Sequence, residues 1–474
     1  MATAVNDKSA AALALTRDWA MLEALMGGTS AMRDAAQSLL PRWPAEDDDG
    51  YKARLASATL FPAYRRTVSV MVGKPFGVEL TASDDMPAEL VEWFDDIDRE
   101  GVSLHVFAAE MFEETFYGLA GILIDAPRPV PTQGAVATMR DQKAAGVRPY
   151  FVRVKHEQIL GWRTAVGANG ARYLAQLRIM ECVTENAGDF GESVIEQVRV
   201  LEPGRWAVHR RNTKGLWDEI ERGETPLPFI PFVPLYGRRR GFMDGAPPLA
   251  ELAHLNVEHW QSKSDQQTIL HAARVPILFG SGFEAATEIE VSPWRAVITT
   301  NPDAKLAWVE HSGQAIEAGA ASLEALEQQM IQSGAELLVK KPGTRTATET
   351  ANDAEGNKSD LRRMIENFED SLNQAVAIMG TWAKLATVGT LTVFKDFGAA
   401  SLSGASSTLI KELAAAGIIS NKTAIVELKR RGELSPEVDA DDEAEAIADQ
   451  GPLLADIRAD PLKIVAAPPV PPTT

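Results

Sequence analysis

The sequence has little cysteine and no long apolar run. Cys182 is the single cysteine among 474 residues, so no disulfide can form within the chain, and the count fits a reducing cytoplasm. Because Cys182 lies in a strand pattern, we expect it to be a buried small hydrophobe. No run approaches the roughly 18 apolar residues of a membrane helix, and the N-terminus lacks the apolar region of a signal peptide. We therefore expect a soluble cytoplasmic protein, neither exported nor inserted in a membrane.

Positive charge is also scarce. The chain has 47 basic and 66 acidic residues, which gives a net charge of −19. Proteins that wrap nucleic acid use Lys and Arg to neutralise phosphates, so this balance argues against such a protein. The acidic balance is compatible with another class of protein, one with an acidic lumen through which DNA slides without binding tightly. The length and the 45% hydrophobic content predict a globular protein with a large core and two to four domains.

Signatures of catalysis are missing as well. The run Gly73-Lys74-Pro75 lacks the pattern of a Walker A motif, and Gly280-Ser281-Gly282 is not a nucleophile elbow. His156-Glu157 lacks the second histidine of a zinc protease. Three further histidines share one predicted helix, but their spacings of five and twelve do not place two imidazoles side by side for a metal: His254, His259 and His271. We expect no enzyme, no cofactor and no metal site.

The longest unbroken pattern is a helix that opens at Pro247-Pro248 and ends before Pro276. At 1.5 Å per residue it would be a rod of roughly 40 Å. Its first half has an apolar stripe that can pack on a core, whereas Gln261 to Thr268 is polar on every side. We expect this polar half to project into solvent or to face a copy of itself. A solvated linker helix is the simpler alternative.

Helices and then strands are expected before this rod. Three helical patterns come first: 14–40 with a break at Gly27-Gly28, 51–72 with a kink at Pro62, and 103–117. An apolar strand, Gly118 to Pro127, follows, and Asp125 at its end is expected to be a turn residue rather than a catalytic one. From Pro149 to Arg211 the period changes to two, which predicts an antiparallel sheet closed by Pro226 to Pro234.

A small β-rich module follows the rod. Its strand candidates are Pro276 to Phe279, Trp294 to Thr300 and a third around Ala304 to Val309. The next predicted helix, Gln314 to Val339, has no basic residue and four acidic ones: Glu317, Glu324, Glu327 and Glu336. The pattern predicts a β module held like a tip on two long, partly solvated helices.

The last third begins with a basic loop, Lys340-Lys341-Pro342-Gly343-Thr344-Arg345-Thr346. A local excess of positive charge is informative in an acidic chain, although a plain surface loop is an equal alternative. Ser359 is expected to N-cap a helix whose apolar residues alternate by three and four up to Leu385, a stripe typical of a core or a helix interface. Three segments complete the chain: a helix pair at 405–432 that restarts near Ser420, an acidic run at 433–445, and a Pro-rich tail expected to be disordered.

This order of elements resembles the portal protein of tailed bacteriophages, a head–tail connector portal of the DUF4055-like family. The resemblance covers roughly Trp19 to Glu445 and depends on a colinear set of stretches rather than on a catalytic motif. These stretches are YKARLASATLFPAYRRTVSVMVGKPF, FYGLAGILIDAP, RPYFVRVKHEQILGWR, FIPFVPLYG, PPLAELAHLNVEHWQSKSDQQTILHAARVPILFGSG, KPGTRTATET with the later SDLRRM, and ELAAAGIISNKTAIVELKRRGEL.

The resemblance implies an α+β portal fold. It consists of an α/β wing, two long stem helices that carry a small β-rich clip, a long channel helix and a helical C-terminal crown. The implied segments are the wing at 1–246, stem helix 1 at 247–275, the clip at 276–313, stem helix 2 at 314–339, the tunnel loop and channel helix at 340–386, and the wing return, crown and tail at 387–474.

It also implies a function. Twelve copies would form a ring at one capsid vertex, the channel for genome packaging and ejection. The implied partners are the large terminase, a head-completion or adaptor protein, the major capsid and scaffold proteins, and transient, sequence-independent double-stranded DNA, with no membrane. The protein would be located in the virion after assembly in the host cytoplasm.

Three groups of site residues follow from the resemblance. Lys340, Lys341 and Arg345 would touch passing phosphates in the tunnel loop without base readout. Phe283 and Trp308, with Phe279 and Trp294, would dock partners on the clip, although Phe279 and Trp294 can equally form the clip's own core. An acidic stem would repel the duplex so that it slides: Glu317, Glu324, Glu327 and Glu336.

Two other classes of protein remain open. Another ring or connector component of a virion would share self-assembly but would normally be much shorter. An enzyme with an unrecognised site is the second alternative, and activity in a strictly monomeric preparation would favour it.

Overall fold

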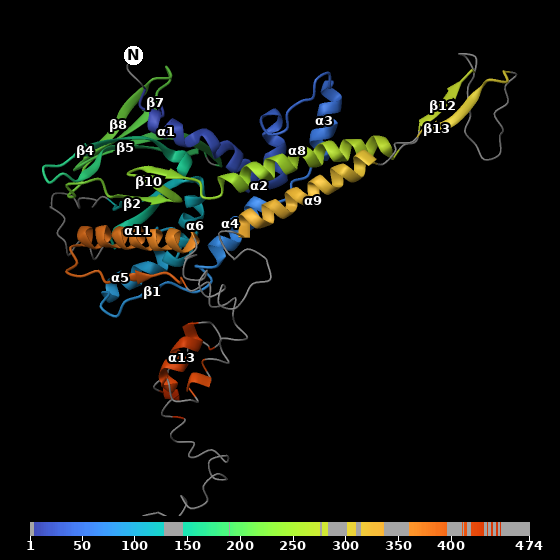
Figure 1. Ribbon diagram of the computed structural model, residues 1–474. Helices are drawn as coiled ribbons and strands as arrows, with labels where there is room; N and C mark the ends of the chain where they lie inside the picture. Colours follow the sequence, from blue (N-terminus) through green and yellow to red (C-terminus); the bar gives the residue numbers. More distant parts are fainter. Residues whose placement is uncertain are drawn as a thin grey trace, which may run out of the picture. The chain divides into compact units, whose positions relative to one another are not determined.

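The computed structural model describes residues 4–127, 146–188, 190–274, 277–282, 301–309, 314–335 and 360–395, and part of 410–446. The chain divides into two compact units, residues 1–393 and 394–474, and each is described by itself. Helices and strands both build the first unit, so the expected α+β class is confirmed (Figure 1). Among the described helices, none combines the length and apolar character needed to cross a membrane.

Short helices form the N-terminal segment: α1 (Ala10–Leu15), η1 (Thr16–Asp18), α2 (Trp19–Asp34), η2 (Ala36–Ser38), α3 (Asp48–Ser57) and α4 (Ala63–Gly73). The predicted break in the first pattern is confirmed, because Gly28 has a φ of 78° inside α2. The single helix predicted over 51–72 is wrong, since α3 and α4 are separate helices. The chain leaves the helical conformation at Ala58, four residues before Pro62, because in a continued helix the Pro62 ring would clash with the Ala58 carbonyl, and α4 starts after Pro62.

The third predicted helix and the strand after it are confirmed. α6 (Leu104–Glu114) begins after Ser103, whose hydroxyl accepts a hydrogen bond from the Val106 N–H at 3.4 Å. A 3₁₀ turn, η4 (Thr115–Tyr117), leads into β2 (Leu119–Asp125), and every residue of β2 except Asp125 is buried. Smaller elements complete this part of the chain: β1 (Thr81–Ala82), α5 (Ala88–Glu92) and η3 (Trp93–Asp96).

The strands form two main antiparallel sheets. In the first, of order β3-β2-β9, the central strand β2 pairs with β3 (Tyr150–Val154) and β9 (Phe232–Tyr236). The second is a five-stranded meander that follows the turn η5 (His156–Gln158): β4 (Ile159–Val166), β5 (Arg172–Ala187), β6 (Gly191–Glu202), β7 (Arg205–Arg211) and β8 (Trp217–Glu224).

The expected extent of the sheet and the expected burial of Cys182 are both wrong. The sheet predicted over 149–211 is split, because β3 pairs with β2 and the meander starts only at β4. β8 was not expected, since its exposed, glutamate-rich sequence shows no apolar face. Cys182, expected to be buried, is exposed, because the second half of β5 extends with β6 into a hairpin that has no covering layer.

The core lies on both faces of the three-stranded sheet. Between the two sheets, apolar side chains such as Leu123, Leu177 and Phe232 form one buried cluster. Side chains alternate along a strand, so Ile122 and Ile124 face the other way, toward the layer that contains α6 and α11 (Asp360–Ala383). The predicted apolar stripe of α11 is confirmed by its buried residues, which include Leu361, Ile365, Phe368, Leu372, Val376 and Met379. Beyond α11, β14 (Leu391–Thr392) pairs with β1.

Two long helices run side by side away from the sheets (Figure 1). They are α8 (Ala250–Ala273) and α9 (Gln314–Ala335), and between them in the chain β12 (Ile277–Ser281) pairs with β13 (Lys305–Val309). We refer to these four elements as the helical arm. The short hairpin of β10 (Arg238–Gly241) and β11 (Asp244–Ala246) precedes α8. A Cβ atom at Gly245 would lie 2.1 Å from the Gly118 carbonyl oxygen, so glycine permits this close backbone crossing at the base of the arm.

In the second unit, α13 (Asn421–Arg430) begins after Ser420, whose hydroxyl accepts a hydrogen bond from the Thr423 N–H at 3.1 Å. This contact is the N-cap expected at the restart of the predicted helix pair, and that part of the prediction is confirmed. The Pro-rich tail lies outside the described residues.

Candidate functional site

A buried amide of α8 contacts the body at the base of the helical arm. Asn256 of α8 is fully buried. Its Oδ1 accepts a hydrogen bond from the Tyr64 N–H at 2.9 Å, and its Nδ2 donates to the Phe61 carbonyl oxygen at 2.8 Å. These are backbone groups that Pro62 leaves without helical partners at the start of α4. The same proline that separates α3 from α4 therefore creates the site that holds α8.

The polar half of α8 is covered by the chain itself. Ser264 and Gln266 are only 2% and 8% exposed, so the expectation that this half projects into solvent or faces a copy is wrong for both residues. Gln266 Nε2 donates to the Ile316 carbonyl oxygen in the first turn of α9 at 2.8 Å. A Cβ at Gly319 would lie 2.1 Å from Gln266 Oε1, so the glycine provides the space for this amide. Polar side chains can thus be buried here because α9 supplies both room and an acceptor.

One histidine of α8 joins the two helices. His259 is 1% exposed, and its Nε2 lies 3.2 Å from Glu327 Oε1 of α9. Burial lowers the pKa of His259, while the Glu327 carboxylate acts in the opposite direction. Several buried polar atoms of α8 have no hydrogen-bond partner within the described protein: His259 Nδ1, Trp260 Nε1, Ser264 Oγ and Gln267 Oε1.

Residues near α3 hold the opposite side of α8. Gln261 Nε2 donates to the Leu39 carbonyl oxygen at 3.0 Å. Arg54 pairs with Glu46 at 2.8 Å and approaches Asp265 of α8 at 3.9 Å. The hydrogen bond from Arg54 lowers the pKa of Glu46, whereas burial raises the pKa of Asp265. The arm is therefore held by polar contacts on two sides.

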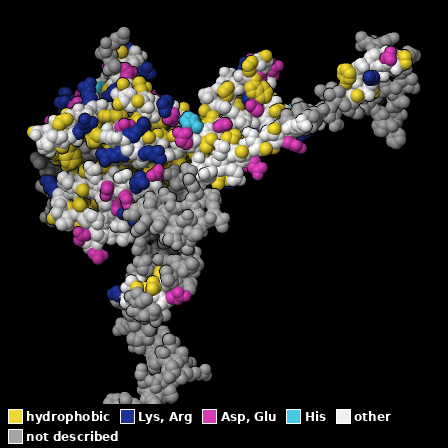
Figure 2. Space-filling view, viewed as in Figure 1, with side chains coloured by type: hydrophobic (Ala, Val, Ile, Leu, Met, Phe, Trp, Pro, Cys, Tyr) yellow, Lys and Arg dark blue, Asp and Glu magenta, His cyan; other side chains and the backbone are white. Residues whose placement is uncertain are grey.

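The outer surface of the arm is acidic with a few apolar side chains. Glu317 and Glu324 are exposed, Glu327 is partly exposed, and α9 contains no Lys or Arg. Figure 2 shows acidic side chains along this part of the molecule. Phe279 of β12, Leu306 of β13 and Ile331 of α9 are 54%, 39% and 57% exposed. Phe279 is thus exposed in the part of the strand pair that the structure describes.

The structure describes only part of the predicted sites. Outside the described residues lie Lys340, Lys341, Arg345, Phe283, Trp294 and Glu336. The backbone of Trp308 is in β13 and pairs with Leu278. The described acidic residues Glu317, Glu324 and Glu327 lie on one helix as expected from their spacing, and only Glu327 contacts α8 through a side-chain hydrogen bond.

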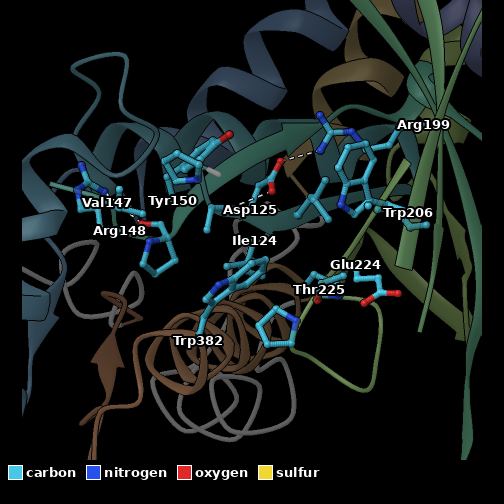
Figure 3. Close-up of a pocket in the computed structure, with 18 of the residues that line it drawn as sticks. Ile124, Asp125, Val147, Arg148, Tyr150, Arg199, Trp206, Glu224, Thr225 and Trp382 are labelled. Carbon is cyan, nitrogen blue, oxygen red and sulfur yellow. Dashed lines mark hydrogen bonds and ion pairs between the residues drawn. The ribbon is translucent and has the colours of Figure 1, made fainter. Parts of the chain in front are cut away.

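A cavity of about 1110 Å³ lies between the two sheets and the end of α11 (Figure 3). Asp125 points into it from the end of β2 and pairs with Arg199 of β6 at 2.6 Å, and Arg199 also lies 2.8 Å from Glu181. Aromatic side chains line the walls, including Trp206, Trp382 and Tyr150, and burial raises the pKa of Tyr150. The sequence analysis did not predict this ion pair, because the two residues are 74 positions apart in the chain and no local pattern links them.

This cavity has no evident catalytic arrangement. Asp125 and Glu181 share the single Arg199 guanidinium, so Asp125 is held in an ion pair. Across the residues that the structure describes, no group of three or more His, Cys, Asp or Glu side chains could hold a metal ion. The surface of the helical arm is the candidate site considered further.

Comparisons with known proteins give one family match and two structural likenesses. Residues 248–383, from α8 to α11, match the family described as "Domain of unknown function (DUF4055)". No curated protein matches.

The chain is similar to one in the virion of a native gene transfer agent (GTA) particle, with 13% identity, a TM-score of 0.41, and coverage of 84% of this chain and 98% of the other. It is also similar to one in the neck of an empty GTA particle computed with C6 symmetry, with 13% identity, a TM-score of 0.43, and coverage of 82% and 95%. Because both TM-scores are below 0.5, we argue function from the geometry of the chain.

Proposed function

We propose that this chain is the subunit of a portal ring, a dodecamer at one capsid vertex of a tailed phage through which the genome is packaged and ejected. The observation that carries the proposal is the helical arm: two long helices, joined through a strand pair, run away from a mixed α/β body. The exposed surface of α9 has glutamates and no Lys or Arg. Such a surface suits the wall of a channel along which duplex DNA slides. The family match covers the same arm.

The exposed apolar side chains of the arm support assembly. Ile331 of α9 and Phe279 of β12 are more than half exposed, so both apolar side chains are open to contact by another chain. A cyclic ring places one face of each copy against a different face of its neighbour. Closure of that ring would cover these side chains, while the large terminase and a head-completion protein would dock on the strand pair. The protein would then be a virion component and not an enzyme.

Native mass spectrometry of the purified, untagged protein tests the ring, with negative-stain images of the same sample. We expect a closed particle of roughly 600 kDa, twelve times the 51.3 kDa chain, with a central hole. The substitution Ile331→Glu should reduce assembly, whereas His254→Ala, at an exposed position of α8, should leave it unchanged. A stable monomer or compact dimer under all conditions would overturn the ring.

Partner and DNA contacts need separate tests. If Phe283→Ser and Trp308→Ser variants kept full terminase binding, the docking role of the strand pair would be dropped. Replacing Lys340, Lys341 and Arg345 by Ala should impair packaging in a salt-dependent manner. Normal packaging by that variant at both low and high salt would exclude the proposed phosphate contact of the tunnel loop. A ring that assembles but never supports terminase-driven packaging would favour another connector component.

A further inference from the structure

Arginine side chains gather on the surface where β10 meets the start of α11. Three of them are consecutive in β10, Arg238, Arg239 and Arg240, and the fourth is Arg363 in the first turn of α11. We call these four residues the arginine cluster. The side chains of Arg238, Arg240 and Arg363 are 60%, 58% and 66% exposed. Figure 2 shows Lys and Arg side chains gathered over β10, in a chain whose net charge is −19.

The acidic neighbours do not neutralise this cluster. Asp360 forms ion pairs with two arginines: its Oδ2 lies 3.1 Å from Arg238 and its Oδ1 lies 3.5 Å from Arg363. Asp244 approaches Arg240 only at 3.6 Å. Arg239 lies over the ring of Tyr236, 5.2 Å from its centroid, and no carboxylate of the described residues is within 4 Å of it. Four guanidinium groups therefore share two carboxylates, which leaves a local excess of two positive charges.

The scaffold beneath the cluster is fixed. β10 is paired with β11, and Arg240 Nη2 donates to the Gly245 carbonyl oxygen at 3.4 Å. The Tyr236 hydroxyl accepts a hydrogen bond from the Met243 N–H at 3.1 Å, which holds the ring under Arg239. Asp360 opens α11, whose apolar stripe is buried in the core. Because these supports are made in the protein alone, the backbone beneath the cluster is ordered before a partner binds, and the entropy cost of binding falls on the exposed arginine side chains.

We propose that the arginine cluster binds the sugar-phosphate backbone of duplex DNA without reading bases. All four cations are arginines, whose planar forks match phosphate oxygens in two-point hydrogen bonds. Arg238 and Arg240 lie on either side of Arg239, with Arg240 at an irregularity in the strand register, and their exposed guanidinium groups can meet separate charges of one regularly charged polymer. The inference rests on the proposed function, which brings duplex DNA to this protein, and it adds a contact that is distinct from Lys340, Lys341 and Arg345.

The test compares two variants of equal charge in the assembled full-length protein. R238Q/R239Q/R240Q removes three charges from the cluster, and R172Q/R211Q/R222Q removes three exposed arginines from the five-stranded sheet. Fluorescence anisotropy measures binding to a labelled duplex of about 30 base pairs across roughly 50–300 mM salt. For the cluster variant we expect Kd to rise about tenfold near 100 mM salt and the salt slope to fall by about 2.7, at about 0.9 per lost phosphate contact. The control variant should change Kd less than about twofold.

Three results would overturn the inference. The first is an equal change in both variants, which would reduce the effect to net charge. The second is an unchanged affinity of the cluster variant for DNA. The third is loss of binding to polyglutamate without loss of binding to DNA, which would assign the cluster to an acidic protein surface. Native mass spectrometry of each variant separates this inference from the proposed function: intact rings with unchanged DNA binding reject only the cluster, whereas the absence of rings in the unmodified protein rejects the portal.

Discussion

The body and the helical arm bury their long helices in opposite ways. The buried face of α11 consists of apolar residues and one glycine that pack against the three-stranded sheet and α6. α8 buries polar side chains together with its apolar ones: Asn256, His259, Ser264 and Gln266. Apolar burial stabilises a fold in proportion to area, whereas a buried polar group does so only when it is hydrogen-bonded.

This difference means that the contacts that stabilise the body differ from those that set the position of α8 along its neighbours. The apolar contacts of α11 depend on buried area and close packing, and Asn373 adds hydrogen bonds to the backbone of Leu391 at 2.7 and 3.0 Å. A shift of α8 by one turn would break both hydrogen bonds of Asn256 and the bond from Gln266 to Ile316. We infer that the core of the body provides most of the stability and that a few directional contacts set the position of the arm.

The largest expected effect is in the body. Phe112 is fully buried, and its ring centroid lies 5.3 Å from that of Phe368 and 5.7 Å from that of Phe76. Phe112→Ala should destabilise the first unit by about 3–5 kcal/mol, because it leaves a cavity that the rings cannot fill. Urea unfolding followed by circular dichroism measures the shift. Phe190→Ala, at a fully exposed position, is the control and should change stability by less than about 0.5 kcal/mol. Similar losses in both variants would contradict the layered core.

A somewhat smaller effect is expected at the base of the arm. Asn256→Leu keeps the side-chain volume but leaves the Tyr64 N–H without its partner, while the Phe61 carbonyl keeps only the hydrogen bond from the Ala63 N–H at 2.9 Å. We expect a loss of about 2–3 kcal/mol in the free energy of unfolding. Hydrogen exchange should show faster opening at the α4–α8 contact than in α11. Unchanged exchange at α8 would show that the amide does not hold the arm, and His254→Ala on the exposed side of the helix serves as the matched control.

Acid should weaken the arm through His259. Burial lowers its pKa in the folded state, so below the ordinary histidine value near 6.5 the unfolded chain binds more protons and stability falls with falling pH. The expected change is a decrease of about 2 °C in Tm between pH 7 and pH 5 that is reduced in His259→Gln. Differential scanning fluorimetry at a series of pH values measures it. The same decrease in the variant and the unmodified protein would assign the pH dependence to other groups.

The smallest expected effect is at Trp260. Trp260 is buried, and its Nε1–H has no acceptor among the described protein atoms. Trp260→Phe removes this unsatisfied donor, so its cost should be at most about 1 kcal/mol and well below the 3–5 kcal/mol typical of truncating a buried aromatic to Ala. Thermal unfolding of Trp260→Phe beside Trp260→Ala provides the comparison. Equal losses of thermal stability in the two variants would mean that the indole N–H has a hydrogen-bond acceptor in the folded protein.

Local patterns predicted the elements that have a local cause. The stripe of α11, the helix restart near Ser420 and the break at Gly28 depend on side-chain periodicity or on one residue's backbone preference. The length of α8 also follows from its sequence, because nothing between Pro248 and Pro276 interrupts a helix.

Contacts between distant segments could not be predicted in the same way. The pairing of β3 with β2 instead of β4, the ion pair of Asp125 with Arg199, and the exposure of Cys182 each depend on which surfaces meet after folding. The Arg238–Arg240 run is visible in the sequence, but its joining to Arg363 through Asp360 is not.

The sequence by itself determined the α+β class, the acidic character and the long uninterrupted α8, because composition and periodicity act within one segment. Only the tertiary structure decided that the polar half of α8 is buried. A helix that is polar on every side is stable beside another helix only when the neighbour offers both an acceptor and space, here the Ile316 carbonyl and the missing Cβ of Gly319. Both lie about 50 residues from Gln266 along the chain, and folding brings them together.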